Sequence, residues 1–148
     1  MTAINRITAE DVASFKHTLA THSGYTDAFG EYQRLATKSA IYPGQGTPLG
    51  LAYVALKLNG EAGEFAEHVG KAMRDDELFD AYSSSADYGE LTPERKALII
   101  KEIGDVLWYL SAACNELGIT LSEAALINLQ KLHERSERGT LRGSGDDR

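Results

Sequence analysis

The sequence contains few of the residues that stabilise small extracellular or β-rich proteins. Only one of its 148 residues, Cys114, is a cysteine, so no disulfide can form within the chain. Three prolines and the lack of alternating β-branched runs argue against a β-rich fold. We therefore expect a helical protein of the reducing cytoplasm, with Cys114 in its core.

Long apolar runs and an excess of positive charge are also missing. No run approaches the roughly 18 apolar residues of a membrane-spanning helix, and the N-terminus does not resemble a signal peptide, so no membrane partner is expected. The 22 acidic and 15 basic residues give a net charge of −7, which disfavours nucleic acid as a partner. A nucleotide ligand remains open, because a metal ion can screen its phosphates from acidic side chains.

Hydrophobic periodicity and capping residues predict an all-α fold, a bundle of four to five helices in a single domain over residues 1–138. Helices are expected at about 9–21, 27–40, 49–74, 93–117 and 122–138, and a disordered tail at 139–148. Thr92 and Ser122 are the expected N-caps of the last two helices, and Gly118 is an expected C-terminal cap. The segment 75–91 has no sustained period and is expected to be a long loop.

Two pairs of carboxylates occur at the same phase of the third and fourth expected helices. Glu61 and Glu64 lie in GEAGEF, and Glu102 and Asp105 lie in EIGDV. At 100° per residue, the first acid of each pair lies at the edge of its apolar stripe and the second lies about 60° further out. If the two helices pack along these stripes, the four carboxylates converge at one rim of the core.

Converging carboxylates repel one another unless a cation binds between them. An all-oxygen ligand set favours Mg²⁺ or Mn²⁺ over zinc or copper, and such sites leave positions for water and substrate phosphates. The alternative is that the acids are solvated and paired with Lys57, Lys71 and Lys101. The matching phase of the two pairs favours the metal site. Gly63 and Gly104 occupy the same phase on their helices, away from the acids, where they would admit close approach of a neighbouring backbone.

Further polar and aromatic side chains are candidates for ligand binding. One face of the fifth expected helix carries Asn128, Lys131, Arg135 and Arg138. They could bind phosphates, although basic residues near a helix C-terminus also complement the helix dipole. Tyr109 follows Asp105 by four residues and could contact a ligand, whereas Trp108 is expected to point elsewhere.

Two well-known site patterns are absent from the sequence. No histidine follows a glutamate by three residues, which excludes the Glu-x-x-His motif of ferritin-like di-iron bundles. His68 follows Glu64 by four residues and is expected to be a surface histidine at the rim of the acids. No G-x-x-x-x-G-K-[ST] segment occurs, which excludes a P-loop NTPase.

These motifs, in this order, resemble the MazG-like all-α nucleoside triphosphate pyrophosphohydrolases, which carry E-x-x-E on one helix and E-x-x-D on a later one. The resemblance extends over about residues 29–139, through YQRLATKSAIYP, LKLNGEAGEFAEHVGK, KEIGDVLWYL and NLQKLHERSERG. It implies a helical bundle that forms a homodimer or homotetramer. It also implies Mg²⁺-dependent hydrolysis of a nucleoside triphosphate, in particular a dNTP, to the monophosphate and pyrophosphate, with Mn²⁺ as a possible substitute.

The resemblance further implies roles for individual residues. The catalytic metal ligands would be Glu61, Glu64, Glu102 and Asp105. The nucleotide contacts would be Gln33, Tyr109, Asn128, Lys131 and Arg135. The segment 75–91 is longer than in compact members and is expected to form a lid or an oligomer contact. A helical bundle that senses nucleotide or metal without turnover is the alternative, and the base preference stays open.

Overall fold

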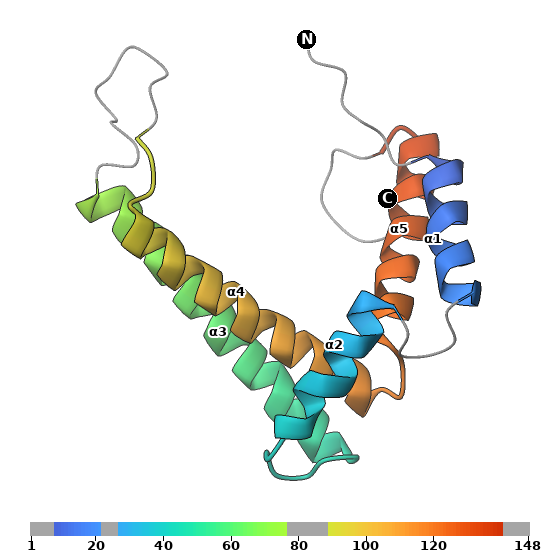
Figure 1. Cartoon of the computed structure of the whole chain (residues 1–148), viewed down its shortest axis with the longest axis horizontal. Helices are drawn as coiled ribbons and strands as arrows, with labels where there is room; N and C mark the ends of the chain where they lie inside the picture. Colours follow the sequence, from blue (N-terminus) through green and yellow to red (C-terminus); the bar gives the residue numbers. More distant parts are fainter. Residues whose placement is uncertain (1–7, 22–26, 77–88, 141–148) are drawn as a thin grey trace.

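The computed structural model describes residues 8–21, 27–76 and 89–140. Within them the chain forms helices and no strands, which confirms the predicted all-α fold (Figure 1). None of these helices combines the length and hydropathy needed to cross a bilayer. The elements, in chain order, are α1 (Ala9–Thr21), α2 (Ala28–Ala36), the short 3₁₀ helix η1 (Thr37–Ser39), α3 (Pro48–Asp75), α4 (Pro93–Glu116) and α5 (Leu121–Glu137).

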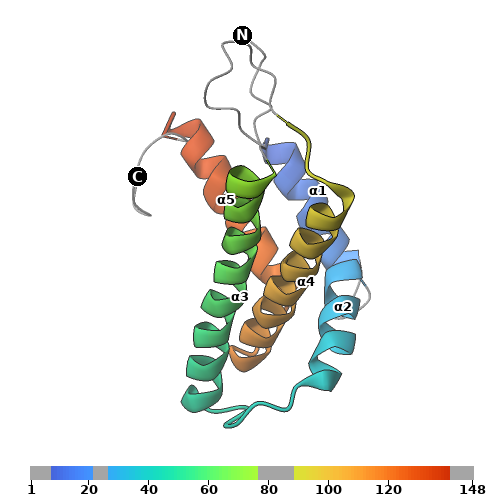
Figure 2. The same cartoon turned by 90° about the vertical axis from the view of Figure 1, so that its left-hand side faces the viewer.

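The two long helices, α3 and α4, pack side by side as an antiparallel hairpin (Figures 1 and 2). Each begins in the same way, with a threonine N-cap followed by a proline in the first turn. Thr47 accepts from the amide of Leu49, and Thr92 accepts from the amide of Arg95, as the sequence predicts for Thr92. This hairpin brings the two predicted acidic motifs onto adjacent helices.

A second helix pair, α1 and α5, diverges from the hairpin, so that the two pairs form the arms of a V in Figure 1. Helix α2 lies between the arms, and it contacts both α4 and α5. Among the described residues, the Cα atoms of α5 and α3 do not approach within 8 Å. The candidate residues on α5 are therefore separated from the first acidic motif within one chain.

Buried side chains join the elements at the vertex of the V, and we call this group the hub. It consists of the polar residues Gln33, Tyr42 and Ser122 and the apolar residues Val54 and Ala112. Gln33, only 1% exposed, donates from Nε2 to the carbonyl of Ile119 and accepts at Oε1 from the amide of Leu121. These bonds satisfy two backbone groups in the connection between α4 and α5.

The loop between η1 and α3 is also fixed to the hub. Glu116 near the end of α4 accepts from the Tyr42 hydroxyl at 2.6 Å and from the amide of Gly46 at 2.9 Å. Burial, followed by the Glu116 carboxylate, raises the pKa of the Tyr42 phenol far above its usual range. A side chain at Gly50 would collide with the carbonyl of Gly44, which explains the glycine at this close approach.

Two local predictions need correction. The second expected helix does not continue regularly to residue 40, because the α-helix ends at Ala36 and tightens into η1, where Ala36 O accepts from the Trp108 indole at 3.1 Å. The N-cap of α5 is Thr120, not Ser122, and Thr120 forms a capping box with Glu123. Ser122 instead donates to Asp27 at 2.6 Å.

The C-terminal caps agree with the prediction more closely. Gly118 has a φ of +67° and follows the end of α4, where Ile119 N bonds Cys114 O at 3.0 Å. Cys114 is buried, as expected. Of the predicted tail, Gly139 and Thr140 close α5 in the same way. Residues 141–148, together with 77–88 of the predicted 75–91 loop, lie outside the described residues.

Candidate functional site

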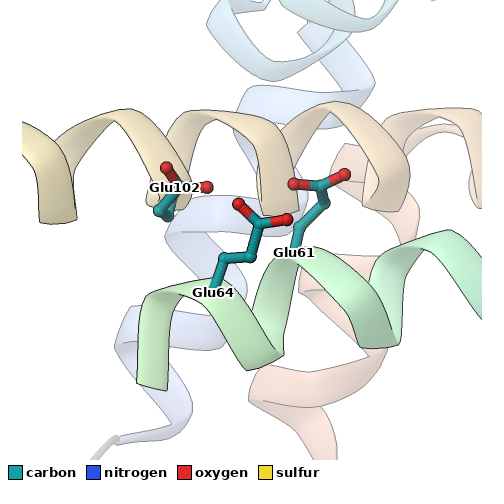
Figure 3. A group of neighbouring side chains, drawn as sticks. All are labelled: Glu61, Glu64 and Glu102. Atoms are coloured by element: carbon teal, nitrogen blue, oxygen red, sulfur yellow. The ribbon is translucent and has the colours of Figure 1, made fainter. Parts of the chain in front are cut away.

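Three carboxylates meet between α3 and α4, and we call this cluster the acid site: Glu61, Glu64 and Glu102. One oxygen from each lies within 4.8 Å of the others. Figure 3 shows the side chains of Glu61 and Glu64 extending from α3 towards α4, where Glu102 lies. The helix period places Glu61 and Glu64 one turn apart on the same side of α3, as the sequence predicts.

Glu102 is the most deeply buried member of the acid site. It is only 2% exposed, and its Oε2 atom is buried without a hydrogen-bond partner among the described residues. Burying a carboxylate with an unpaired oxygen costs several kcal/mol unless a cation or donor compensates it. This unpartnered oxygen and the all-carboxylate donor set fit a hard divalent cation such as Mg²⁺.

Two lysines partly neutralise the acids. Lys57 lies 3.6 Å from Glu61, while Lys101 lies 3.2 Å from Glu102 and 3.4 Å from Asp105. These two carboxylates raise the pKa of the Lys101 ammonium group, chiefly through the hydrogen bond to Glu102. The ion pairs expected under the alternative therefore exist for Lys57 and Lys101. They leave Glu102 Oε2 without a partner in the described part of the chain, so they do not compensate the acid site fully.

The remaining predicted ligand, Asp105, lies beside the acid site. The structure brings three of the four predicted acids together in one cluster. Asp105 instead faces an adjoining cavity that Glu61 also lines. The prediction from helical phase treats the two helices alike, but how deeply each carboxylate is buried depends on how the helices pack.

The adjoining cavity is aromatic and has a volume of about 570 Å³, within the range of sites for small ligands. Tyr42 stacks on Tyr53 with ring centroids 5.8 Å apart, and Trp108 meets Tyr109 edge-on at 4.8 Å. The lining residues are Ser39, Ile41, Tyr42, Pro43, Tyr53, Glu61, Asp105, Trp108 and Tyr109. The cavity thus joins aromatic surface to two of the predicted acids.

Of the four aromatic side chains that line the cavity, Tyr109 is a predicted contact, whereas Tyr42, Tyr53 and Trp108 were not predicted to bind a ligand. Tyr109 lines it, and burial raises the pKa of the Tyr109 phenol. Trp108, expected to point away from the acids, donates its indole to Ala36 O at the end of α2 and to Ser39 Oγ, and it also lines the cavity. Tyr53 lies about two helical turns before Glu61, a spacing that could have indicated it. Tyr42 belongs to an irregular loop and has no periodic signal.

The other predicted nucleotide contacts lie elsewhere. Asn128 and Lys131 are exposed on α5, where Arg135 is half-buried, and none of them lines the aromatic cavity. Gln33 is buried in the hub with both ends of its amide bonded to backbone groups. His68, expected at the surface, is half-buried, and its Nε2 lies 3.9 Å from Glu102 Oε1.

Comparison with known proteins identifies the family. The family model of the MazG nucleotide pyrophosphohydrolase domain matches residues 51–140, which contain all four predicted acids. The chain is also 41% identical over 120 residues to the Gene 37 protein of Mycobacterium phage L5, covering 79% of this chain and 96% of the relative. No solved structure matches the chain. The chain belongs to the MazG nucleotide pyrophosphohydrolase domain family.

Proposed function

We propose that this protein hydrolyses a nucleoside triphosphate, in particular a dNTP, to the nucleoside monophosphate and pyrophosphate in the presence of Mg²⁺. Membership of the family supports nucleotide pyrophosphohydrolase activity in general. The observation that carries the specific proposal is the acid site, with its buried unpartnered Glu102 oxygen, next to the aromatic cavity. The acid site suits a metal-bound polyphosphate, and the aromatic cavity suits a nucleotide base.

The acid site would hold the metal, with Asp105 as a further ligand from the cavity side. When bound, Mg²⁺ would supply Lewis-acid stabilisation of the polyphosphate charge, and Mn²⁺ could substitute for it. Lys57 and Lys101 already lie within 4 Å of these acids, so both can contact phosphate oxygens there. Their positive charges would stabilise the transition state and the leaving pyrophosphate.

The bond that breaks joins the α-phosphorus to the oxygen that bridges it to the β-phosphorus. A water molecule attacks the α-phosphorus and loses a proton, which Glu61 or Glu64 can accept. The pyrophosphate leaves with the bridging oxygen. Meanwhile Tyr42, Tyr53 and Tyr109 would hold the base by stacking, which positions the α-phosphorus beside the acids.

A panel of eight nucleotides, four NTPs and four dNTPs, tests this proposal with Mg²⁺ and chromatographic detection. The expected result is monophosphate and pyrophosphate in equal amounts, with faster turnover of at least one dNTP than of its ribonucleotide. A helical bundle that senses nucleotide or metal, the competing hypothesis, predicts binding without product. Release of orthophosphate instead of pyrophosphate would contradict the proposed bond cleavage.

The chain is further proposed to act as a homodimer or homotetramer. Large apolar side chains are exposed along the hairpin, including Leu56 at 76% and Ile100 at 57%. A Cβ atom added at Gly60, Gly63 or Gly104 would meet no atom within 4 Å from the rest of the described chain, beyond the glycine's own stretch of helix. Glycine within a helix nevertheless costs about 1 kcal/mol. A second copy packed on this arm would cover the apolar groups and could approach the two helices closely at these glycines.

An oligomer would also account for the predicted contacts on α5. Asn128, Lys131 and Arg135 are remote from α3 in one chain, but a second copy could bring its α5 to the acid site. Complementation tests this arrangement: inactive Glu102→Gln and Lys131→Ala variants are mixed, unfolded and refolded together. Recovered activity supports a shared site, whereas no recovery with confirmed mixed oligomers assigns each site to one chain.

A further inference from the structure

His68 lies beside the acid site but has no assigned role there. It follows Glu64 by four residues on α3, so both side chains project from the same side of the helix, one turn apart. The side chain is 20% exposed, and its Nε2 atom lies 3.9 Å from Oε1 of Glu102 on α4. An imidazole thus lies next to Glu102, the most buried member of the carboxylate cluster.

The interaction between His68 and Glu102 is incomplete. A separation of 3.9 Å is too long for a hydrogen bond. Within the described residues, His68 Nδ1 and Glu102 Oε2 are both buried without a hydrogen-bond partner. Each side chain therefore keeps one buried polar atom without a partner, while Glu102 Oε1 accepts from Lys101 at 3.2 Å. Unsatisfied buried polar atoms of this kind are typical of a site that binds a further group.

The spacing suits two ligands of one metal ion. Metal–ligand bonds of about 2.1 Å place the donor atoms roughly 3 Å apart when they are adjacent and roughly 4.2 Å apart when they are opposite. The 3.9 Å between His68 Nε2 and Glu102 Oε1 is close to the separation of two opposite ligands.

We propose that His68 is a metal ligand, together with Glu102, and that its nitrogen shifts the metal preference of the acid site towards Mn²⁺ and away from Mg²⁺. The proposal rests on the metal centre of the proposed function. Imidazole nitrogen binds first-row transition ions more readily than it binds Mg²⁺, which prefers oxygen and retains its water. The four carboxylates alone would not provide this discrimination.

The test is electron spin-echo spectroscopy of Mn²⁺ bound to the full-length protein, which detects ligand nitrogen directly and requires no turnover. We expect a nitrogen modulation that changes frequency when histidine is labelled with ¹⁵N. The modulation should disappear in His68→Gln and persist in the matched control His133→Gln, whose histidine lies on α5. In calorimetric titrations, His68→Gln should weaken Mn²⁺ binding roughly tenfold and change Mg²⁺ binding by less than about twofold.

The possible outcomes separate this proposal from the proposed function. Bound Mn²⁺ without histidine nitrogen modulation in the labelled wild-type protein overturns the role of His68, while pyrophosphate release with Mg²⁺ leaves the function intact. Modulation that persists in His68→Gln also overturns it. If Mn²⁺ does not bind at all, the metal centre itself is wrong. The isotope experiment on wild-type protein needs no variant, so a folding defect in His68→Gln cannot obscure the answer.

Discussion

The hub and the acid site both bury polar side chains, but only the hub satisfies them from within the described chain. Gln33 makes two hydrogen bonds to backbone groups, and Ser122 donates to Asp27. Glu102, at a similar depth, keeps one oxygen without a partner. A protein tolerates such a cost where the group serves a ligand, so the difference distinguishes structural burial from functional burial.

Apolar side chains are also more deeply buried in the hub than beside Glu102. Val54 and Ala112 in the hub are fully buried, whereas Ile100 and Ile103 beside Glu102 are more than half exposed. The hub is therefore complete within one chain. The arm that carries the acid site retains apolar surface that a second copy would cover.

The largest expected effect comes from Glu102→Gln, which removes the buried charge and keeps the shape of the side chain. Pyrophosphate release should fall at least about 10³-fold, because the variant loses a central metal ligand. The free energy of unfolding should not fall, because the wild-type carboxylate is buried without full compensation. Steady-state kinetics and urea unfolding measure the two quantities. A stable variant with wild-type activity would remove the acid site from the mechanism.

Gln33→Leu should lower stability and leave activity unchanged, the opposite of Glu102→Gln. It leaves Ile119 O and Leu121 N without their partner and should cost roughly 3 kcal/mol of stability. Tm should fall by about 6–12 °C, as followed by circular dichroism. Activity per folded molecule should be retained at low temperature. A large increase in KM at unchanged stability would instead support Gln33 as a nucleotide contact.

Tyr109→Leu tests the aromatic cavity, which adjoins the acid site. Loss of stacking should raise KM roughly tenfold with little change in kcat, because base stacking contributes about 1–3 kcal/mol. Tyr109→Phe keeps the ring and should remain within about twofold of the wild type. Equal losses in both variants would show that the hydroxyl, not the ring, makes the contact.

The smallest effect concerns the capping box that begins α5. Thr120→Ala should lower the free energy of unfolding by about 1 kcal/mol. Hydrogen bonds from the backbone and side chain of Thr120 lower the pKa of Glu123. Its stabilisation is therefore complete above the unfolded-state pKa, about 4.3, and is lost as pH falls through the lower folded-state value. Glu123→Gln should flatten the fall of Tm between neutral and acidic pH, and an unchanged pH profile would exclude this contribution.

Much of the acid site could be predicted because helical phase determines which side chains share a face. Glu61 and Glu64 needed only the helix period and the E-x-x-E spacing. The grouping of Glu102 with them, and the separation of Asp105, depends on how deeply α4 packs against α3, which no pattern within a single helix encodes. The family match supports the prediction of the overall fold through the same two long helices.

The hub could not be predicted in the same way, because its interactions join residues far apart in the chain. Gln33 bonds to backbone groups more than 80 positions away. Thr120 and Ser122 are both acceptable N-caps by residue type, and the choice depends on Asp27, which accepts from Ser122 in the folded protein. Tyr42 enters the aromatic cavity through the bond of its hydroxyl to Glu116, which the sequence does not indicate.

Calorimetric titration with Mg²⁺ shows whether the acid site binds a divalent metal ion through Glu102. The wild-type protein should bind Mg²⁺ saturably, and Glu102→Gln should lose that binding. The matched control is Glu67→Gln on the same arm, where Glu67 pairs with Lys71 at 2.6 Å, and it should bind like the wild type. Unchanged Mg²⁺ binding by Glu102→Gln would show that Glu102 is not a ligand of the metal ion.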